Sequence, residues 1–248
     1  MSESTGPKTA QQIIRNLHNF NRKERDHLMK FALSNAPESP RVSKALWEQI
    51  WPKGDGSKPP SPEQMFVGMD YHLNWLFAAL KLTNEYEDNQ IPPLKNEWPE
   101  CLSEEHKPED HPIQGNQQDI DLLVAFPVKS NVLHLVLIEA KFDTGWGSTQ
   151  FRSKIQRLKA IKSLTDSYKD LEVQWKLMLA SPSNSGPKRG AFAPSSLGKL
   201  PDWISEGAGE ERAVPHFQFG PSQAYRVKRS RKEEGSPWEV LQTNLRGR

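Results

Sequence analysis

The sequence predicts an α/β fold in which helices flank a mixed β-sheet. At its centre, aliphatic strand-forming residues fill 118–128 and again 132–142, and the two runs form a predicted hairpin. Amphipathic helical patterns stand on either side of this hairpin at 61–82 and 148–165, and another strand-forming run follows at 172–180. The order of helix, hairpin, helix and strand is typical of helices packed around a sheet.

The composition is that of a folded protein with local concentrations of charge. The 248 residues are 35% hydrophobic and 26% charged, with a net charge of only +2, which suits one α/β domain with additions or two small domains. Residues 150–162 contain five basic residues and no acidic one, the segment from Arg226 to Arg248 is also basic, and 85–110 is strongly acidic. Basic patches of this kind can bind phosphates although the total charge is near zero.

Disulfides, cysteine-based zinc sites and membrane insertion are not expected. The single cysteine, Cys101, excludes an intramolecular disulfide and a multi-cysteine zinc site. No apolar run approaches the ~20 residues of a membrane-spanning helix, and residues 1–10 lack the apolar core of a signal peptide. We therefore expect a cytoplasmic protein with no membrane partner.

Residues 1–60 are expected to form an N-terminal helical region. Apolar residues at helical spacing and one helix-opening signal support this expectation, because Asn21 with Glu24 resembles a capping box. The expected elements are helices over 11–20, 21–34 and 42–51, followed by a linker rich in Gly, Pro and Lys over 52–60.

The core is expected to span residues 61–182 and to open with a long helix. Ser61-Pro62-Glu63-Gln64 is a strong helix start, with Ser as the cap, Pro at the first helical position and Gln three residues after the cap. The apolar pattern continues this helix to about Leu82. The polar, acidic stretch 83–116 is either a long loop or a loop with one short edge strand.

A specific register follows from the predicted hairpin. If its turn is centred on residue 130, Asp121 lies directly across from Glu139. Side chains on a strand repeat with a period of two, so Lys141 shares the face of Glu139. Two acids and a lysine would then meet at the end of two aliphatic runs, where an unpaired charge is costly.

The rest of the chain supplies a helix, a strand and an extension. On the predicted helix 148–165, a polar stripe contains Gln150, Lys154 and Arg157, opposite an apolar face. Residues 183–248 are expected to be a C-terminal extension with a basic tail, packed on the core. Its predicted short strands are His216–Phe219, Ala224–Val227 and Trp238–Leu241.

Asp121, Glu139 and Lys141 suit metal-dependent phosphodiester hydrolysis. Mg²⁺ prefers oxygen ligands and keeps several of its waters, so two carboxylates often suffice, and the carbonyl oxygen of Ala140 could add a third ligand. Lys141 would lie beside the attacking water, where its charge lowers the pKa of that water and counters the charge of the transition state.

The pattern Ile120-Asp121 … Ile138-Glu139-Ala140-Lys141 resembles the signature of the PD-(D/E)XK nuclease superfamily, whose fold is called restriction-endonuclease-like. Gln150, on the helix after the lysine strand, is similar to a glutamine that many members carry near the active site. The helix predicted around Asp70 is similar to the family's first core helix, which often brings a further acid toward the metal. The order of elements matches the family's αβββαβ core if a first strand is hidden before Gln118.

This resemblance implies a Mg²⁺-dependent endonuclease, with Mn²⁺ as a substitute, that acts on nucleic acid and on DNA in preference to RNA. A homodimer would suit cleavage of both strands. The implied metal ligands are Asp121, Glu139 and Ala140, with Lys141, Gln150 and Asp70 as further catalytic residues. Arg152, Lys154 and Arg157 are a solvated helix face by default and become phosphate contacts if the protein is a nuclease. Asp70 has the alternative of being a surface residue of its helix.

A second function stays open on the sequence alone. The same fold could serve as a non-catalytic nucleic-acid-binding or assembly module, because fold does not fix function. The large regions outside 61–182 favour this alternative, whereas the presence of both acids and the lysine argues against it.

Overall fold

The computed structural model describes most of the predicted core and parts of its flanks. It divides into two compact units, one of residues 1–138 and 149–177 and one of residues 139–148 and 178–248. The described residues are 9–33, 42–51, 60–85, 112–113, 115, 118–141, 148–182, 201–204, 214–220, 223–229 and 238–244. The predicted linker 52–60, except Pro60, and most of the segment 83–116 lie outside the described residues.

Three helices precede the sheet, as the sequence predicts. They are α1 (Ala10–Phe20), α2 (Glu24–Leu33) and α3 (Lys44–Ile50). Helix α1 begins with a capping box in which the Thr9 hydroxyl accepts a hydrogen bond from the Gln12 N–H and the Gln12 side chain accepts one from the Thr9 N–H. Its apolar side is fully buried at Ile13 and Leu17.

The long helix predicted from Ser61 to Leu82 is wrong. Only a short 3₁₀ turn forms at Pro62–Gln64, and then strand β1 (Phe66–His72) leads directly into helix α4 (Leu73–Glu85). The Gln64 side chain does cap this turn, since its Oε1 accepts the Ser61 N–H at 3.1 Å. Pairing of β1 with a strand far along the chain outweighs the local helical pattern.

The predicted hairpin and its register are confirmed. Strands β2 (Asp119–Lys129) and β3 (Val132–Ala140) pair antiparallel from Leu122↔Ile138 to Pro127↔Leu133, which centres the turn on residue 130. An irregularity between Pro127 and Lys129 closes the pairing at Lys129↔Val132. Strand β2 is buried from Leu123 to Phe126, which makes it the middle of the core.

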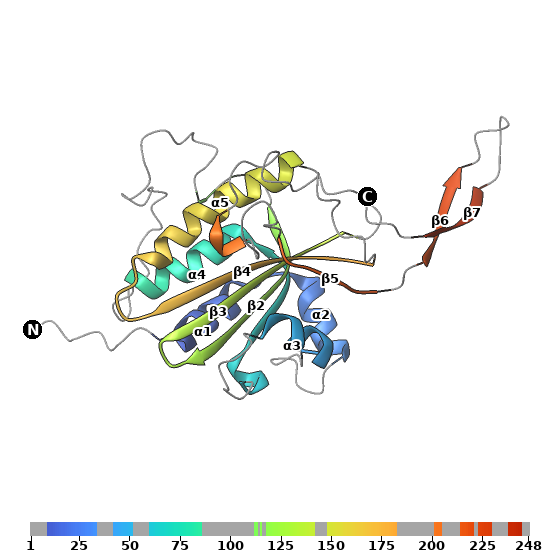
Figure 1. The fold of residues 1–248 in the computed structure, drawn as a ribbon. Helices are drawn as coiled ribbons and strands as arrows, with labels where there is room; N and C mark the ends of the chain where they lie inside the picture. The colour runs from blue at the N-terminus through green and yellow to red at the C-terminus, as the bar shows by residue number, and fades with distance from the viewer. Residues whose placement is uncertain are drawn as a thin grey trace, which may run out of the picture. The chain divides into compact units, whose positions relative to one another are not determined.

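The sheet is mixed and has five strands in the order β1-β2-β3-β4-β5, which confirms the α/β class. Helix α5 (Ser148–Asp166) precedes β4 (Glu172–Ser181), and β4 pairs in parallel with β5 (His216–Gln218). Within the first unit, Figure 1 shows α4 and α5 on one side of the strands and α2 and α3 on the other. The rings of Trp47 and Trp51 cover Phe126 of β2 from α3.

A separate two-stranded sheet follows in the second unit. Strands β6 (Gln223–Arg229) and β7 (Trp238–Asn244) pair antiparallel, and a short 3₁₀ turn at Asp202–Ile204 lies between β4 and β5 in the sequence. The three short strands predicted after residue 213 are therefore confirmed, two of them longer than expected.

Gly68 of β1 supplies a test of this packing. A Cβ at this position would lie 2.6 Å and 2.8 Å from ring atoms of Phe66, which is fully buried and has no room to move. We expect Gly68→Ala to lower the free energy of unfolding by about 1–3 kcal/mol, because an overpacked core must distort.

Urea unfolding followed by circular dichroism measures this effect. Gly115→Ala is the matched control, since nothing lies within 4 Å of a Cβ built there. Equal stability of the two variants would contradict the close approach of Phe66 to the β1 backbone.

Candidate active site

Strands β1 and β2 bring two of the candidate acids into one row. Pairing of Met69 with Leu122 and of Tyr71 with Ile120 leaves Asp70 opposite Asp121 in the register. Asp70 has a left-handed backbone conformation, with φ of 48°, which aspartate adopts more readily than most residues. Both acids are half-buried.

Asp70 therefore lies on a strand and not on the predicted first core helix. Its carboxylate forms an ion pair with Arg25 of α2 at 3.6 Å. The Arg25 side chain is 80% exposed, so this pair contributes little to stability. Strand pairing, which the sequence pattern did not indicate, leaves Asp70 across from Asp121 in the register, and a role of Asp70 at a metal site stays a prediction.

A second polar row lies next to the first. His72 pairs with Asp119 across β1 and β2, and the Asp119 carboxylate accepts a 2.6 Å ion-paired hydrogen bond from Lys23. Lys154 of α5 donates to the Asp119 carbonyl oxygen at 2.7 Å. Lys23, just before α2, and Lys154 of α5 thus both contact Asp119, the first residue of β2, two positions before Asp121.

The His72 imidazole is held in its neutral form. Its Nδ1 accepts the Asn74 N–H at 3.0 Å, which requires an unprotonated nitrogen. Burial lowers the pKa of His72 below its ordinary value; Asp119 opposes this shift, and the positive charges of Arg157 and Lys23 add to it.

Arg157 of α5 ties three segments together beneath these rows. Its guanidinium is fully buried and donates to the Pro112 carbonyl oxygen at 2.9 Å, to Gln118 Oε1 at 3.3 Å and to Asn74 Oδ1. Burial lowers the pKa of Arg157 to about 10, against the opposing charge of Asp119. The guanidinium therefore remains charged at neutral pH.

The expected exposed stripe on α5 is corrected by these contacts. The helical spacing of Lys154 and Arg157 does place them on one side, but that side faces the start of β2 because its polar atoms satisfy the two long side chains. Arg152 is exposed and keeps the position expected of a phosphate contact. Gln150 belongs to α5, and its side chain lies outside the described residues.

The remaining candidates belong to the end of β3, in the second unit. Glu139 is only 4% exposed, which is unusual for a carboxylate. Ala140 and Lys141 are half-buried, and the Lys141 N–H donates to the Ala180 carbonyl oxygen of β4 at 2.9 Å. Asp121 stands one residue before Leu122 and Glu139 one residue after Ile138, so both lie just outside the outermost recorded β2–β3 pair.

The donor set consists of carboxylate and carbonyl oxygens, which fit a hard cation such as Mg²⁺ or Mn²⁺. Within the described part of the chain, no group of three or more His, Cys, Asp or Glu side chains is gathered closely enough to hold a metal ion. The fit of the site to a metal thus depends on two carboxylates completed by water, as Mg²⁺ commonly binds.

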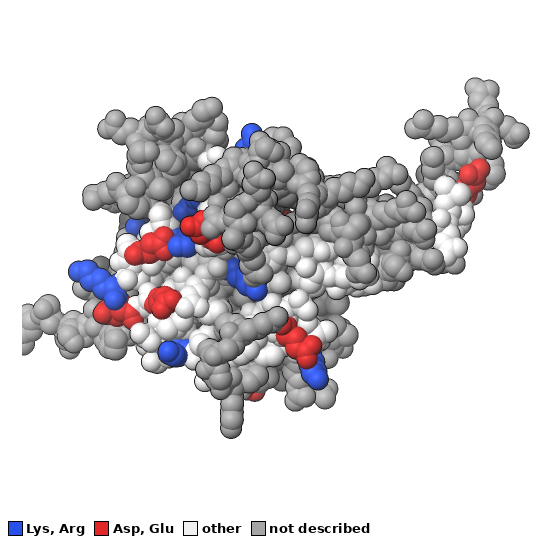
Figure 2. Space-filling model, viewed as in Figure 1, with Lys and Arg blue, Asp and Glu red and all other residues white. Residues whose placement is uncertain are grey.

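Charge on the visible surface is mixed and does not mark the site. Over the helices and strands of the first unit, Figure 2 shows described acidic and basic side chains interspersed on the face in view. No continuous basic surface is formed there by the described residues.

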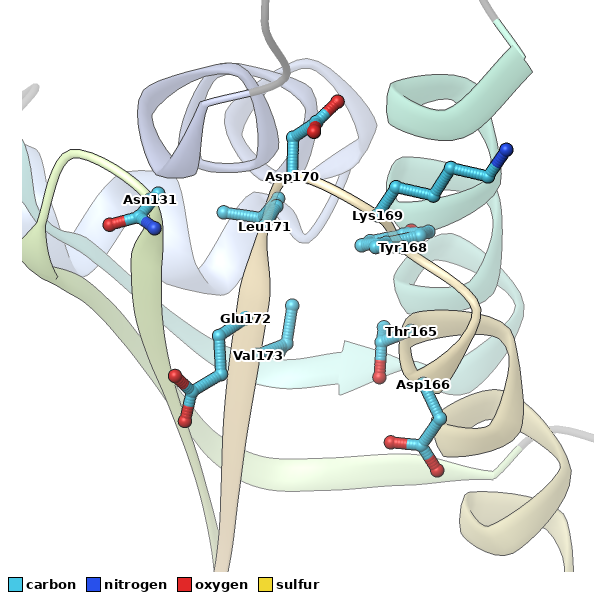
Figure 3. Close-up of a pocket in the computed structure, with 9 residues that line it drawn as sticks. All are labelled: Asn131, Thr165, Asp166, Tyr168, Lys169, Asp170, Leu171, Glu172 and Val173. Carbon is cyan, nitrogen blue, oxygen red and sulfur yellow. The ribbon is translucent and has the colours of Figure 1, made fainter.

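A depression of about 580 Å³ lies at the other end of the hairpin. Residues of the α5–β4 connection and Asn131 of the turn line it, and Figure 3 shows its acids Asp166, Asp170 and Glu172 pointing in different directions. Glu139 stands eight positions after Asn131 along β3, a distance of roughly 27 Å at strand rise. The depression is therefore not part of the candidate site.

Sequence reasoning missed Lys23, His72 and Asp119. One signal was present, because Asp119 stands two residues before Asp121 and must share its strand face. His72 and Lys23 gave no comparable signal, since one stood in a predicted helix and the other reaches Asp119 across 96 residues of sequence.

Comparisons with known proteins do not assign this site. The chain matches no protein-family model, no curated protein and no solved structure. None of the helices in the described ranges has the length and apolar character needed to cross a membrane.

Arg157 gives a direct test of the cluster. We expect Arg157→Met to lower the free energy of unfolding by about 2–5 kcal/mol, because three acceptors lose their buried donor. Arg152→Met, a change on the exposed side of the same helix, should stay within about 0.5 kcal/mol of the wild type. Urea unfolding compares the two, and similar stabilities would show that the guanidinium contacts do not support the fold.

His72 predicts a pH dependence of stability. With its folded pKa below the unfolded value of about 6.5, the unfolded chain binds a proton that the folded chain does not as the pH falls. The contribution to stability is therefore intact above pH ~6.5 and is lost as the pH drops toward the folded pKa. In His72→Gln, the free energy of unfolding should decline less steeply between pH 7 and 5, and parallel curves would contradict a lowered pKa.

Proposed function

We propose that this protein is a metal-dependent nuclease that hydrolyses phosphodiester bonds in nucleic acid, with DNA as the favoured substrate. One observation carries the proposal, the pairing of β2 with both of its neighbours. The β1–β2 pairs on either side of Asp70 support a position opposite Asp121, and the β2–β3 register, if it continues by one residue past Leu122↔Ile138, would make Glu139 the partner of Asp121.

In this proposal, the carboxylates of Asp121 and Glu139 and the carbonyl oxygen of Ala140 hold one divalent cation. A bound Mg²⁺ would polarise the phosphoryl group and activate a water molecule. The burial of Glu139 supports this role, because a buried carboxylate is stabilised by a counter-charge. Asp70 would act on the cation through one of its water molecules, because the described acids do not gather as a group of three.

Lys141 is proposed to assist the attacking water. It follows Glu139 by two residues, so the strand period assigns both to one face, and its backbone is fixed by the hydrogen bond to Ala180. A positive charge at that place would hold the water in its deprotonated form and offset the charge of the transition state. Gln150 and Arg152 are proposed to contact the substrate from the start of α5.

The order of elements supports the resemblance to the PD-(D/E)XK superfamily. Strand β1, the hairpin β2–β3, helix α5 and strand β4 follow the βββαβ part of the family's αβββαβ order, with α1, α2 and α3 before β1 and α4 inserted between β1 and β2. The helix expected around Asp70 as the first core helix is replaced by strand β1. The first strand thus does precede Gln118, within the segment predicted as a helix.

A non-catalytic nucleic-acid-binding or assembly module is the second candidate. It is favoured by the absence, among described side chains, of a group of three metal-binding residues. It predicts nucleic-acid binding that does not depend on metal and that survives replacement of Lys141.

Cleavage assays separate the two candidates. With labelled duplex DNA and Mg²⁺, Asp121→Ala and Lys141→Ala should each reduce the cleavage rate on the order of 10³-fold, because each removes a group that stabilises the transition state. EDTA should stop cleavage by the wild type and Mn²⁺ should restore it. Asp70→Gly, which suits the left-handed backbone, tests the contribution of Asp70.

Asp170→Ala is the matched control, because this exposed acid lines the depression at the far end of the hairpin. It should cleave at the wild-type rate, and all variants should retain the wild-type circular dichroism spectrum. Failure of the wild type to cut DNA or RNA with either metal would overturn the proposal, as would full activity of the Lys141 variant.

A further inference from the structure

The β6–β7 ribbon has two faces of different chemistry. Its register alternates rows along the two strands, so residues on one face are separated by residues on the other. The Val227 face consists of the pairs Gln223↔Asn244, Tyr225↔Gln242, Val227↔Val240 and Arg229↔Trp238. The opposite face consists of the pairs Ala224↔Thr243, Arg226↔Leu241 and Lys228↔Glu239.

Both faces are exposed where the structure describes their side chains. Val227 and Val240 are 63% and 67% exposed, and Leu241 on the opposite face is 40% exposed. The two strands form a sheet by themselves. A two-stranded sheet is at best marginally stable by itself in water, and the exposed Val227 and Val240 add to that deficit. A partner that covers the Val227 face would relieve it.

Charge identifies the class of that partner. Five of the seven residues from Arg226 to Lys232 are basic, and the acid within the paired strands, Glu239, belongs to the face opposite Val227. The Val227 face contains no acidic residue among its eight positions. A second copy of the chain would bring like charges together, which disfavours pairing of ribbon with ribbon. A polyanion would be attracted by the basic residues of 226–232 and would meet no acid on the Val227 face.

The residue types on the Val227 face are those that read base edges. Arg pairs with guanine, Asn and Gln pair with adenine, and apolar side chains contact the thymine methyl group. These types are represented by Arg229, Gln242, Asn244 and the exposed pair Val227 and Val240. The major groove of B-form DNA, about 12 Å wide, admits a two-stranded ribbon, whereas the major groove of A-form RNA is too narrow.

We infer that the β6–β7 ribbon binds duplex DNA by inserting its Val227 face into the major groove. The basic residues within 226–232 add electrostatic attraction to the phosphate backbone. This inference concerns DNA binding alone and holds whether or not the candidate active site cleaves.

Adjacent positions on β7 provide a matched pair of variants. Val240→Glu puts an acid on the Val227 face and Leu241→Glu puts the same acid on the opposite face, so both change the net charge equally. Both side chains are exposed, so neither change puts a charge into a buried position. Circular dichroism and thermal unfolding of the full-length proteins check that both variants fold.

The experiment measures fluorescence anisotropy of a labelled 25-base-pair duplex DNA with the full chain in EDTA, which excludes cleavage. Val240→Glu should raise Kd about tenfold or more, whereas Leu241→Glu should raise it by about threefold or less. The double variant Arg226→Gln/Lys228→Gln should weaken the dependence of log Kd on log salt concentration, because fewer counterions are released.

Equal Kd values for the two glutamate variants would overturn the inference, as would tighter binding to duplex RNA than to duplex DNA. Sedimentation velocity tests whether a second copy of the chain occupies the Val227 face instead of DNA. A wild-type dimer that dissociates in the Val240→Glu variant would show that it does. These binding results test the ribbon and do not depend on whether the protein is a nuclease. A wild type that binds through the ribbon without cutting with Mg²⁺ or Mn²⁺ would count against the nuclease alone.

Discussion

The pairing of strand β2 with a neighbour on each side governs which side chains meet at the start of that strand. A slip of one residue in either register would move every side chain of β2 to the other face. The buried residues Leu123 to Phe126 prevent such a slip, because it would exchange the environments of side chains that fill opposite faces of the sheet. The position of Asp121 relative to Asp70 is therefore a consequence of core packing in the middle of the strand.

Arg157 extends this control to the segment before β2. Its guanidinium hydrogen-bonds the Pro112 carbonyl, the Gln118 side chain and the Asn74 side chain, so one residue of α5 ties the approach to β2 to the first turn of α4. Lys154, one helical turn earlier, binds the carbonyl oxygen of Asp119. Helix α5 thus fixes the end of the strand that carries the acids, and the candidate site and the local fold depend on the same contacts.

The elements with a strong local pattern could be predicted from the sequence, and those that depend on distant pairing could not. The aliphatic runs of β2 and β3 and the turn between them determine a register that the structure confirms. Strand β1 was hidden because Phe66, Met69, Leu73 and Leu76 also satisfy a helical pattern, and its partner strand lies some fifty residues away in sequence. Arg157 was misplaced for a related reason, since its burial requires acceptors from three separate segments.

Asp70 has a strained backbone conformation and lies at the proposed metal site. A left-handed backbone costs most L-residues roughly 1–2 kcal/mol, and glycine would adopt it without that cost. Like charges opposite each other on paired strands are also destabilising, and the exposed Arg25 pair offsets little of this at Asp70. The backbone strain and the repulsion between the two acids both occur where the cation is proposed to bind. A divalent ion held by Asp121 would offset the repulsion between Asp121 and Asp70, so the arrangement that weakens the metal-free fold would strengthen the metal-bound one.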